Sequence, residues 1–249
     1  RKLGARSYHT IARGAGAGAL SPEDAAQAVV EGTLLGAYRF TELKADRADV
    51  EPDLEALTLV EFNSASLEAV RRGAEVGRIV GEATCYARDL VNRPGNYCTP
   101  TVLANSARAM AEAVGLTVRV LGEGEMAELG MGALLGVAQG SHEPATFTIL
   151  EHNAERHDLP AYVVVGKGIT FDSGGISIKP SDGMERMKDD MSGAAATLGA
   201  MRAVAALELP LRVVGLVPAT ENLPGSRAYK PGDVLTAMTG RTIEVISTD

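Results

Sequence analysis

The sequence is poor in residue types on which several classes of protein depend. It has no Trp and only 4% aromatic residues, so aliphatic side chains must build the core. Its two cysteines, Cys85 and Cys98, are too few for a disulfide framework and are typical of a reducing compartment. No apolar run approaches the ~18 residues of a membrane span. A net charge of −8 disfavours a nucleic-acid surface. We therefore expect a cytoplasmic protein that partners neither membranes nor nucleic acids.

Three segments differ in their sequence patterns. Residues 1–65 combine a helix opened by Ser21 and Pro22 with a following strand, and are expected to be the C-terminal part of an N-terminal α/β domain. Residues 66–92 keep apolar residues at helical spacing and predict a linker helix. Residues 93–249 alternate strands with helices. The fold class is therefore α/β, with a mostly parallel or mixed sheet flanked by helices.

Two apolar runs of the third segment predict strands. GALLGVAQGS, residues 132–141, is read as a strand and turn. LPAYVVVGKG, residues 159–168, is nearly continuous in apolar residues, which predicts a strand buried on both faces. After this strand, the stretch VVVGKGITFDSGGISIK is read as a loop that holds Lys167, Asp172 and Lys179 among four glycines. A solvated turn, a phosphate cradle and a metal site would each explain such a loop.

The phosphate interpretation fits the pattern poorly. In the motif G-x-x-x-x-G-K-[ST] the lysine closes the motif, whereas Lys167 precedes most of the glycines. Phe171 occupies the third glycine position of G-x-G-x-x-G, and Asp172 would repel an anion. The solvated turn remains open, because single Lys and Asp residues are typical of weak surface pairs.

Three aspartates fall at the ends of predicted elements. Asp172 follows the apolar strand, and Asp190 precedes the predicted helix MSGAAATLGA. Asp249 follows a strand predicted to end near Ile246. Because open α/β sheets bind ligands beyond the carboxyl ends of their strands, these carboxylates should converge on one rim. Their mutual repulsion is removed by two divalent cations about 3.5–4 Å apart, so the combination favours a metal site.

The two lysines are assigned different parts in such a site. An amine binds a metal only after losing its proton, which neighbouring cations favour, so Lys167, close to Asp172, is the candidate ligand. Lys179 lies farther along the loop and is expected to keep its proton and polarise a substrate carbonyl. The histidines share no ligand spacing and are read as surface or loop residues: His9, His142, His152 and His157.

At this point the sequence resembles the leucyl aminopeptidase family of cytosolic metallo-aminopeptidases with two metal ions. The resemblance runs through VGKGITFDSGGISIKP, MKDDMSGAAATLGAMRAVAALELPLRVVGL, ENLPGSRAYKPGDVLTAMTGRTIEV and STD, over roughly residues 90 to 249. It implies that residues 93–249 are the N-terminal portion of a metallopeptidase catalytic domain. It also implies a function: release of N-terminal residues, leucine preferred, from peptides by a metal-activated water.

The resemblance implies roles for six residues. The metal ligands would be Lys167, Asp172, Asp190 and Asp249, binding two Mn²⁺ or Zn²⁺ ions. Lys179 would be the catalytic lysine and contact substrate, and Met187 would line the pocket for the first side chain of the peptide. The family also implies a homo-hexamer and a bound bicarbonate in the full-length protein.

The family pattern continues past the end of this chain. There NTD is followed by AEGR, which supplies a further ligand and a catalytic arginine, whereas this sequence stops at Asp249. We therefore expect a fragment that lacks both the native N-terminus and the C-terminal part of the catalytic domain, and that is inactive alone. A nucleic-acid-binding role, known for some members, and a degenerate paralogue are the alternatives.

Overall fold

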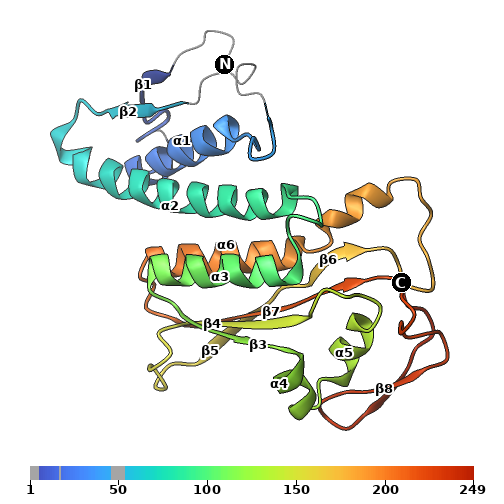
Figure 1. Cartoon of the computed structure of the whole chain (residues 1–249). Helices are drawn as coiled ribbons and strands as arrows, with labels where there is room; N and C mark the ends of the chain where they lie inside the picture. The colour runs from blue at the N-terminus through green and yellow to red at the C-terminus, as the bar shows by residue number, and fades with distance from the viewer. Residues whose placement is uncertain (1–5, 17, 46–53) are drawn as a thin grey trace. The chain divides into compact units, whose positions relative to one another are not determined.

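The computed structural model describes residues 6–16, 18–45 and 54–249 (Figure 1). Its contacts divide the chain into two compact units, Arg1–Cys85 and Tyr86–Asp249. The boundary lies within helix α2 (Leu67–Asn92), which occupies the segment expected to be a linker helix. The division into three domains stays a prediction. Parts of the predicted N-terminal domain, residues 1–5, 17 and 46–53, lie outside the described residues.

The first unit is a small α/β element. Apart from α2, it contains β1 (Ser7–Ile11), α1 (Pro22–Ala37), β2 (Ala56–Val60) and the 3₁₀ helix η1 (Ser64–Ser66). The two strands pair in parallel. Helix α1 begins as its sequence predicts, because the Ser21 hydroxyl accepts the amide of Asp24 at 3.0 Å and Pro22 occupies the first turn.

The second unit holds the larger sheet. Its elements are α3 (Pro100–Val114), β3 (Thr117–Leu121), α4 (Glu123–Glu128), α5 (Gly132–Ala138), β4 (Thr146–His152), β5 (Ala161–Val165), β6 (Gly168–Asp172), the 3₁₀ helix η2 (Met184–Asp189), α6 (Ser192–Ala206), β7 (Arg212–Asn222), β8 (Val234–Thr236) and β9 (Thr242–Glu244). None of the described helices is both long and apolar enough to cross a membrane.

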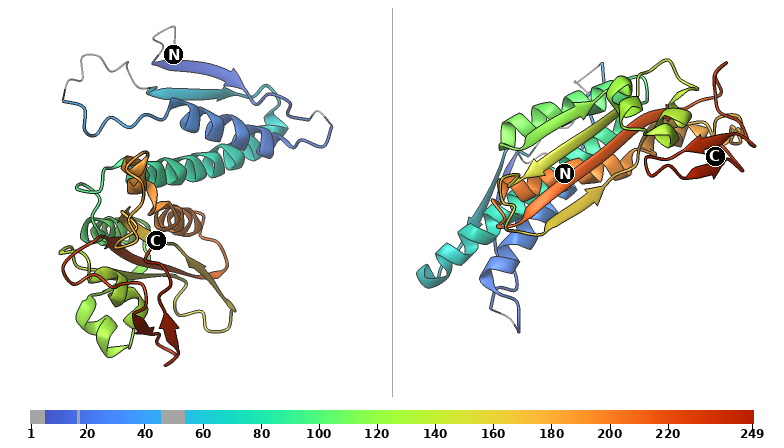
Figure 2. Two further views of the ribbon diagram at one scale, coloured as in Figure 1. Left: turned by 90° about the vertical axis from the view of Figure 1, so that its right-hand side faces the viewer. Right: turned by 90° about the horizontal axis from the view of Figure 1, so that it is seen from below.

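The larger sheet is mixed, as the sequence predicted. Its strand order is β3-β4-β7-β5, with β6 also paired to β7 (Figure 2). Strand β4 runs antiparallel to both β3 and β7, whereas β5 and β6 both run parallel to β7. Strand β5 pairs with residues 212–216 of β7 and β6 with residues 219–222. Strand β7 therefore extends far enough to carry Asn222 beside the end of β6.

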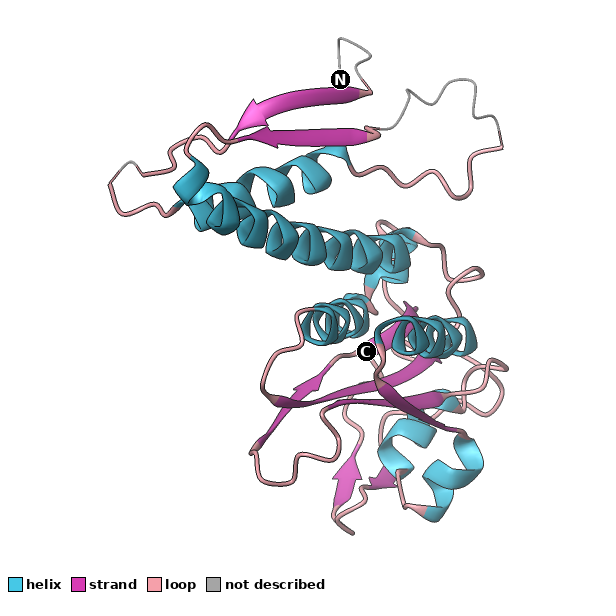
Figure 3. Ribbon diagram, turned by 90° about the vertical axis from the view of Figure 1, so that its left-hand side faces the viewer, coloured by secondary structure: helices cyan, strands magenta, loops and turns pink. Residues whose placement is uncertain are grey.

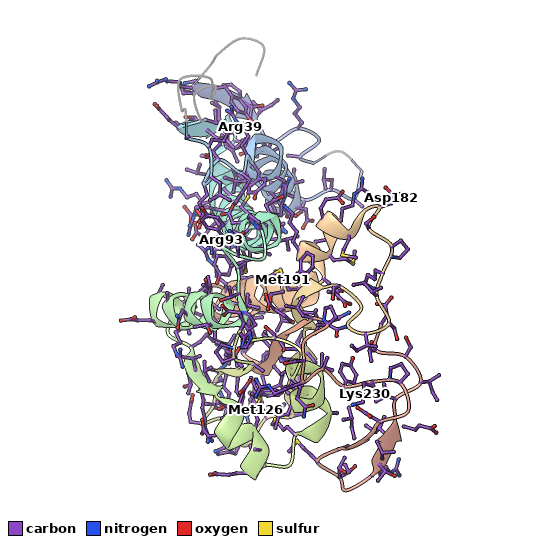
Figure 4. All side chains as sticks on the ribbon, turned by 45° about the vertical axis from the view of Figure 1, so that its right-hand side comes forward. Arg39, Arg93, Met126, Asp182, Met191 and Lys230 are labelled. Atoms are coloured by element: carbon purple, nitrogen blue, oxygen red, sulfur yellow. The ribbon has the colours of Figure 1, made fainter. Side chains whose placement is uncertain are left out.

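Helices α3 and α6 lie side by side on one face of this sheet (Figures 1 and 3). The core between the helices and the sheet is aliphatic, as the scarcity of aromatics requires, and burying each such side chain contributes about 1.5–3 kcal/mol. Its most deeply buried members, all fully buried, are Leu103, Leu150, Met191, Leu198 and Met201. Met191, labelled in Figure 4, lies at the start of α6 and ties this end of the helix to the core.

A second apolar cluster lies around helices α4 and α5, and the sequence had predicted a strand at α5. Residues 132–141 do not begin with a strand, because Gly132–Ala138 forms helix α5. A short apolar run without a clear period fits either element. Here α5 packs with α4, whose Met126 is fully buried, and with Leu121 of β3.

The prediction of a strand buried on both faces is also wrong. Strand β5 is present, but all five of its residues are exposed. Tyr162 and Val165 are 55% and 64% exposed. An apolar run fixes neither the place of its strand in a sheet nor what covers the strand's two faces; here β5 lies at an edge, and no other strand of the described residues pairs with its free side.

Candidate metal centre

Lys167 lies in the link between β5 and β6, which packs against the start of α6. The amide of Ala194 donates to the Lys167 carbonyl at 2.9 Å. A Cβ on Gly166 would lie only 2.3 Å from the carbonyl oxygen of Gly193. Residue 166 must therefore be glycine, and this backbone contact fixes where the Lys167 side chain leaves the main chain.

Asp172 is the last residue of β6 and is 7% exposed. The Gly174 amide and the Asn222 Nδ2 donate to its Oδ1 at 2.9 and 2.8 Å. Burial opposes ionisation, but these hydrogen bonds outweigh it and lower the pKa of Asp172. Its Oδ2 is left to face the amines of Lys167 and Lys179, at 4.0 and 3.8 Å.

Asp190 directly follows η2 and lies just before α6. Its Oδ2 is 2.6 Å from the Lys167 amine. Burial raises the pKa of Asp190, and the charge of Asp172 adds to the rise against the attraction of Lys167. Among the described residues, none gives the buried Asp190 Oδ2 a well-directed hydrogen bond. A buried acceptor oxygen of this kind suits a cation.

Lys179 connects the third aspartate, Asp249, to Asp172. Its backbone amide donates to the Ser173 carbonyl at 2.9 Å, which folds the loop back toward Asp172. Its amine donates a hydrogen bond to Asp249 and is 3.8 Å from Asp172 Oδ2. The bond to Asp249 raises the pKa of Lys179, so the amine is held in its charged form.

The five side chains form one continuous charged group. Their three carboxylates and two amines give a net charge of −1 when all are ionised. Within the part of the chain that the structure describes, no three Asp, Glu, His or Cys side chains gather closely enough to hold a metal by themselves. The aspartates are instead linked through the lysines, and an amine can join such a donor set as a metal ligand only after it has lost its proton.

Two details of the predicted rim differ in the structure. The segment after β5 is not all loop, because Gly168–Asp172 forms β6 and carries Asp172 to the end of a strand. Asp249 does not follow a strand of the large sheet, since β9 ends at Glu244 and pairs only with β8 in a separate two-stranded sheet. Asp249 reaches the group through its bond with Lys179.

Met187 lies within η2, which packs against β6. Its side chain is partly exposed, and its carbonyl accepts the amide of Asp190 at 3.4 Å. The assignment of Met187 to a substrate pocket stays a prediction.

Comparison with known proteins decides the family. A family model described as "Cytosol aminopeptidase family, catalytic domain" matches residues 85–249, the whole of the second unit. The chain belongs to the cytosol aminopeptidase family. A probable cytosol aminopeptidase of Geotalea uraniireducens is 48% identical over 100% of this chain and 50% of its own length. One of Chlorobaculum tepidum is 49% identical over 92% of this chain and 46% of its own.

Two solved structures are also similar to this family member. The bottromycin maturation enzyme BotP in complex with Mn superposes with a TM-score of 0.86 at 37% identity, over 98% of this chain and 50% of that one. A second structure of BotP gives a TM-score of 0.85 at 38% identity. The chain thus spans about half the length of the relatives that it matches.

Sequence reasoning missed three residues around the charged group of this family member. Asn222 contacts Asp172, and both Asn222 and Tyr229 donate to the carbonyl of Thr248, the residue before Asp249. Strand β7 continues to Asn222, beyond the apolar run LRVVGLVPA that marks this strand in the sequence. Extending β7 to Asn222 would have placed that residue beside Asp172.

Proposed function

We propose that the protein is a metal-dependent aminopeptidase that releases N-terminal residues, leucine preferred, from peptides. The observation that supports it best is the family match over residues 85–249, joined with the gathering of two lysines and three aspartates in that segment. These residues lie far apart in sequence and meet at one place. A weakly paired surface loop gives no reason for that arrangement.

Four residues of this chain would hold the metal, in the positions that the resemblance implies. They are Lys167, Asp172, Asp190 and Asp249, and two Mn²⁺ or Zn²⁺ ions are proposed. A structure of BotP is described with Mn, which favours Mn²⁺ as the first ion to test. The bound ions supply Lewis-acid polarisation of the substrate carbonyl and lower the pKa of a bound water.

The chain's own residues prepare the site for that chemistry. Asp172 is held ionised by the Gly174 amide and Asn222, which leaves its second oxygen available as a ligand. With Asp172 and Asp249 engaged as metal ligands, Lys179 would no longer be held by its bond to Asp249. The charged amine would then be free to donate to the substrate carbonyl and stabilise the oxyanion. Met187 is proposed to line the pocket for the first side chain.

A paired assay tests the proposal. Hydrolysis of leucine p-nitroanilide is measured with added Mn²⁺ on this chain and on the chain extended by the C-terminal half of the Geotalea relative. Turnover by the extended chain, lost on replacing Lys179 by Met or on adding EDTA, is expected. This chain alone is expected to give none. An extended chain that binds Mn²⁺ but cleaves no aminoacyl anilide would refute the activity.

The remaining properties are proposed from the family. The full-length protein is proposed to be a cytoplasmic homo-hexamer that binds peptides and, near its active site, bicarbonate. Its relatives are named cytosol aminopeptidases, which supports the location. The net charge of −8 argues against nucleic acid as a partner. Light scattering on the extended chain tests the hexamer, and a gel-shift with salt titration tests nucleic-acid binding.

A further inference from the structure

Thr248 stands at the centre of a buried hydrogen-bond cluster and is 3% exposed. Its hydroxyl donates to the Gly174 carbonyl at 2.7 Å and accepts the Ser177 amide at 2.8 Å. Its own amide donates to the Ser177 hydroxyl at 3.2 Å. These three bonds join the loop that follows Asp172 to the segment that carries Asp249, across about seventy residues of sequence.

Asn222 extends this cluster to the metal-binding carboxylate. It ends β7 and is 5% exposed. Its Nδ2 donates to Asp172 Oδ1 and to the Thr248 carbonyl, each at 2.8 Å. The Asn222 amide thus fixes the distance between the Asp172 side chain at the end of β6 and the backbone next to Asp249.

The chemistry of the partners fixes the orientation of this amide. Both are acceptors, a carboxylate oxygen and a carbonyl oxygen, so the NH₂ group must face them. The Asn222 Oδ1 is buried without a hydrogen-bond partner among the described residues. It lies against Gly175, where a Cβ would come within 2.8 Å of it. Because a buried unpaired oxygen costs free energy, the arrangement persists only through the two bonds on the other side of the amide.

Tyr229 closes the cluster from the segment after β7. Its hydroxyl donates to the Thr248 carbonyl at 2.9 Å, so that carbonyl accepts two hydrogen bonds. The Tyr229 side chain is 8% exposed. The backbone next to Asp249 is therefore held by two side chains, only one of which also touches Asp172.

The geometry points to Asn222 as a positioning residue that sets the separation of Asp172 and Asp249 before any cation binds. The inference rests on the proposed function, since it gives these two aspartates the same metal centre. Asn222 touches no reacting atom in this role and acts through the Asp172 carboxylate and the Thr248 carbonyl next to Asp249. Residues that orient metal ligands in this way usually affect metal affinity by about 10–100-fold.

The test compares three variants of this chain. Asn222→Ala removes the side-chain amide. Tyr229→Phe removes a single oxygen atom, and it serves as the second variant should Asn222→Ala fail to fold. Thr146→Ala is the matched control, because Thr146 is 9% exposed and its hydroxyl donates to the Pro100 carbonyl, away from the aspartates. Hydrogen exchange is measured without metal, and affinity and visible spectrum are measured with Co²⁺ alone.

Two results are expected of Asn222→Ala. Without metal, the Ser177 and Thr248 amides should exchange about five- to tenfold faster. With Co²⁺, affinity should fall about 10–100-fold and the absorption bands should shift. Tyr229→Phe should show the same changes in smaller measure, and Thr146→Ala should show neither.

Other outcomes separate the possible failures. Faster exchange with unchanged Co²⁺ affinity and spectrum would reduce Asn222 to a structural residue and overturn the inference. Unchanged exchange in Asn222→Ala would show that the cluster does not hold the two segments together. A chain that binds no Co²⁺ before substitution would overturn the proposed metal centre itself, and the positioning role with it.

Discussion

Replacing Gly166 by Ala tests how the Lys167 backbone is placed. The new Cβ would lie 2.3 Å from the Gly193 carbonyl oxygen and 2.5 Å from the Thr197 hydroxyl. Carbon and oxygen atoms approach to about 3.3 Å at closest, so the β5–β6 link and the start of α6 must separate by roughly 1 Å. That shift also stretches the hydrogen bond from Ala194 to Lys167, which is 2.9 Å long.

The expected loss of stability follows from these two effects. Overpacking of this kind costs about 1–3 kcal/mol, and the weakened hydrogen bond costs about 1 kcal/mol more. For a chain of this size, a loss of roughly 2–4 kcal/mol lowers Tm by roughly 5–15 °C. Thermal unfolding followed by circular dichroism measures the shift, and the Co²⁺ affinity should fall as well, because Lys167 moves away from Asp190.

Gly124→Ala is the matched control. Gly124 lies in helix α4, and a Cβ there would meet nothing within 4 Å. Alanine in a helix is favoured over glycine by about 1 kcal/mol, so this variant should keep or raise Tm. A Gly166→Ala variant that unfolds at the wild-type temperature and binds Co²⁺ as tightly would refute the close-contact account of Lys167.

Three further predictions concern single side chains. Asp190→Asn keeps a hydrogen-bonding group beside Asp172 and removes a carboxyl group whose pKa is raised, so the Tm of the metal-free protein should not fall. Its Co²⁺ affinity, measured by titration, should drop by more than about tenfold. Burial raises the pKa of Tyr86 from 10.0 to about 12, so the unfolded chain loses this proton at a lower pH than the folded chain. The free energy of unfolding should therefore decline from about pH 10 upward. In Tyr86→Phe, urea unfolding should show no such decline from this side chain. Ser21→Ala removes the cap on the Asp24 amide and should lower the free energy of unfolding by about 1 kcal/mol, with an unchanged Co²⁺ affinity as the internal control.

The sequence pattern predicted the site better than the sheet around it. Asp172, Asp190 and Asp249 were expected to converge, with Lys167 close to Asp172, and in the structure ion contacts through Lys167 join Asp172 to Asp190. Local signals suffice here, since a strand, a tight glycine-rich link and a helix start are all encoded within a short stretch.

The errors arise where the outcome depends on distant partners. Residues 161–165 are apolar whether their strand lies in the middle of a sheet or at an edge, and the pairing of β5 with β7 alone leaves them exposed. The helix Gly132–Ala138 was mistaken for a strand because a run this short has no decisive period. Asn222 was missed because its role depends on Asp172 and Thr248, which are distant in sequence.

The exposed edge of β5 has a practical consequence for experiments with this chain. Tyr162, Val163, Val164 and Val165 present an uncharged β-branched and aromatic surface beside a strand edge with which no other strand of the described residues pairs. Edges of this composition pair with edges of other molecules, which leads to oligomers and precipitation. Solubility should therefore decline as the protein is concentrated, and a lysine placed at residue 163 should delay the onset of turbidity without touching the charged group.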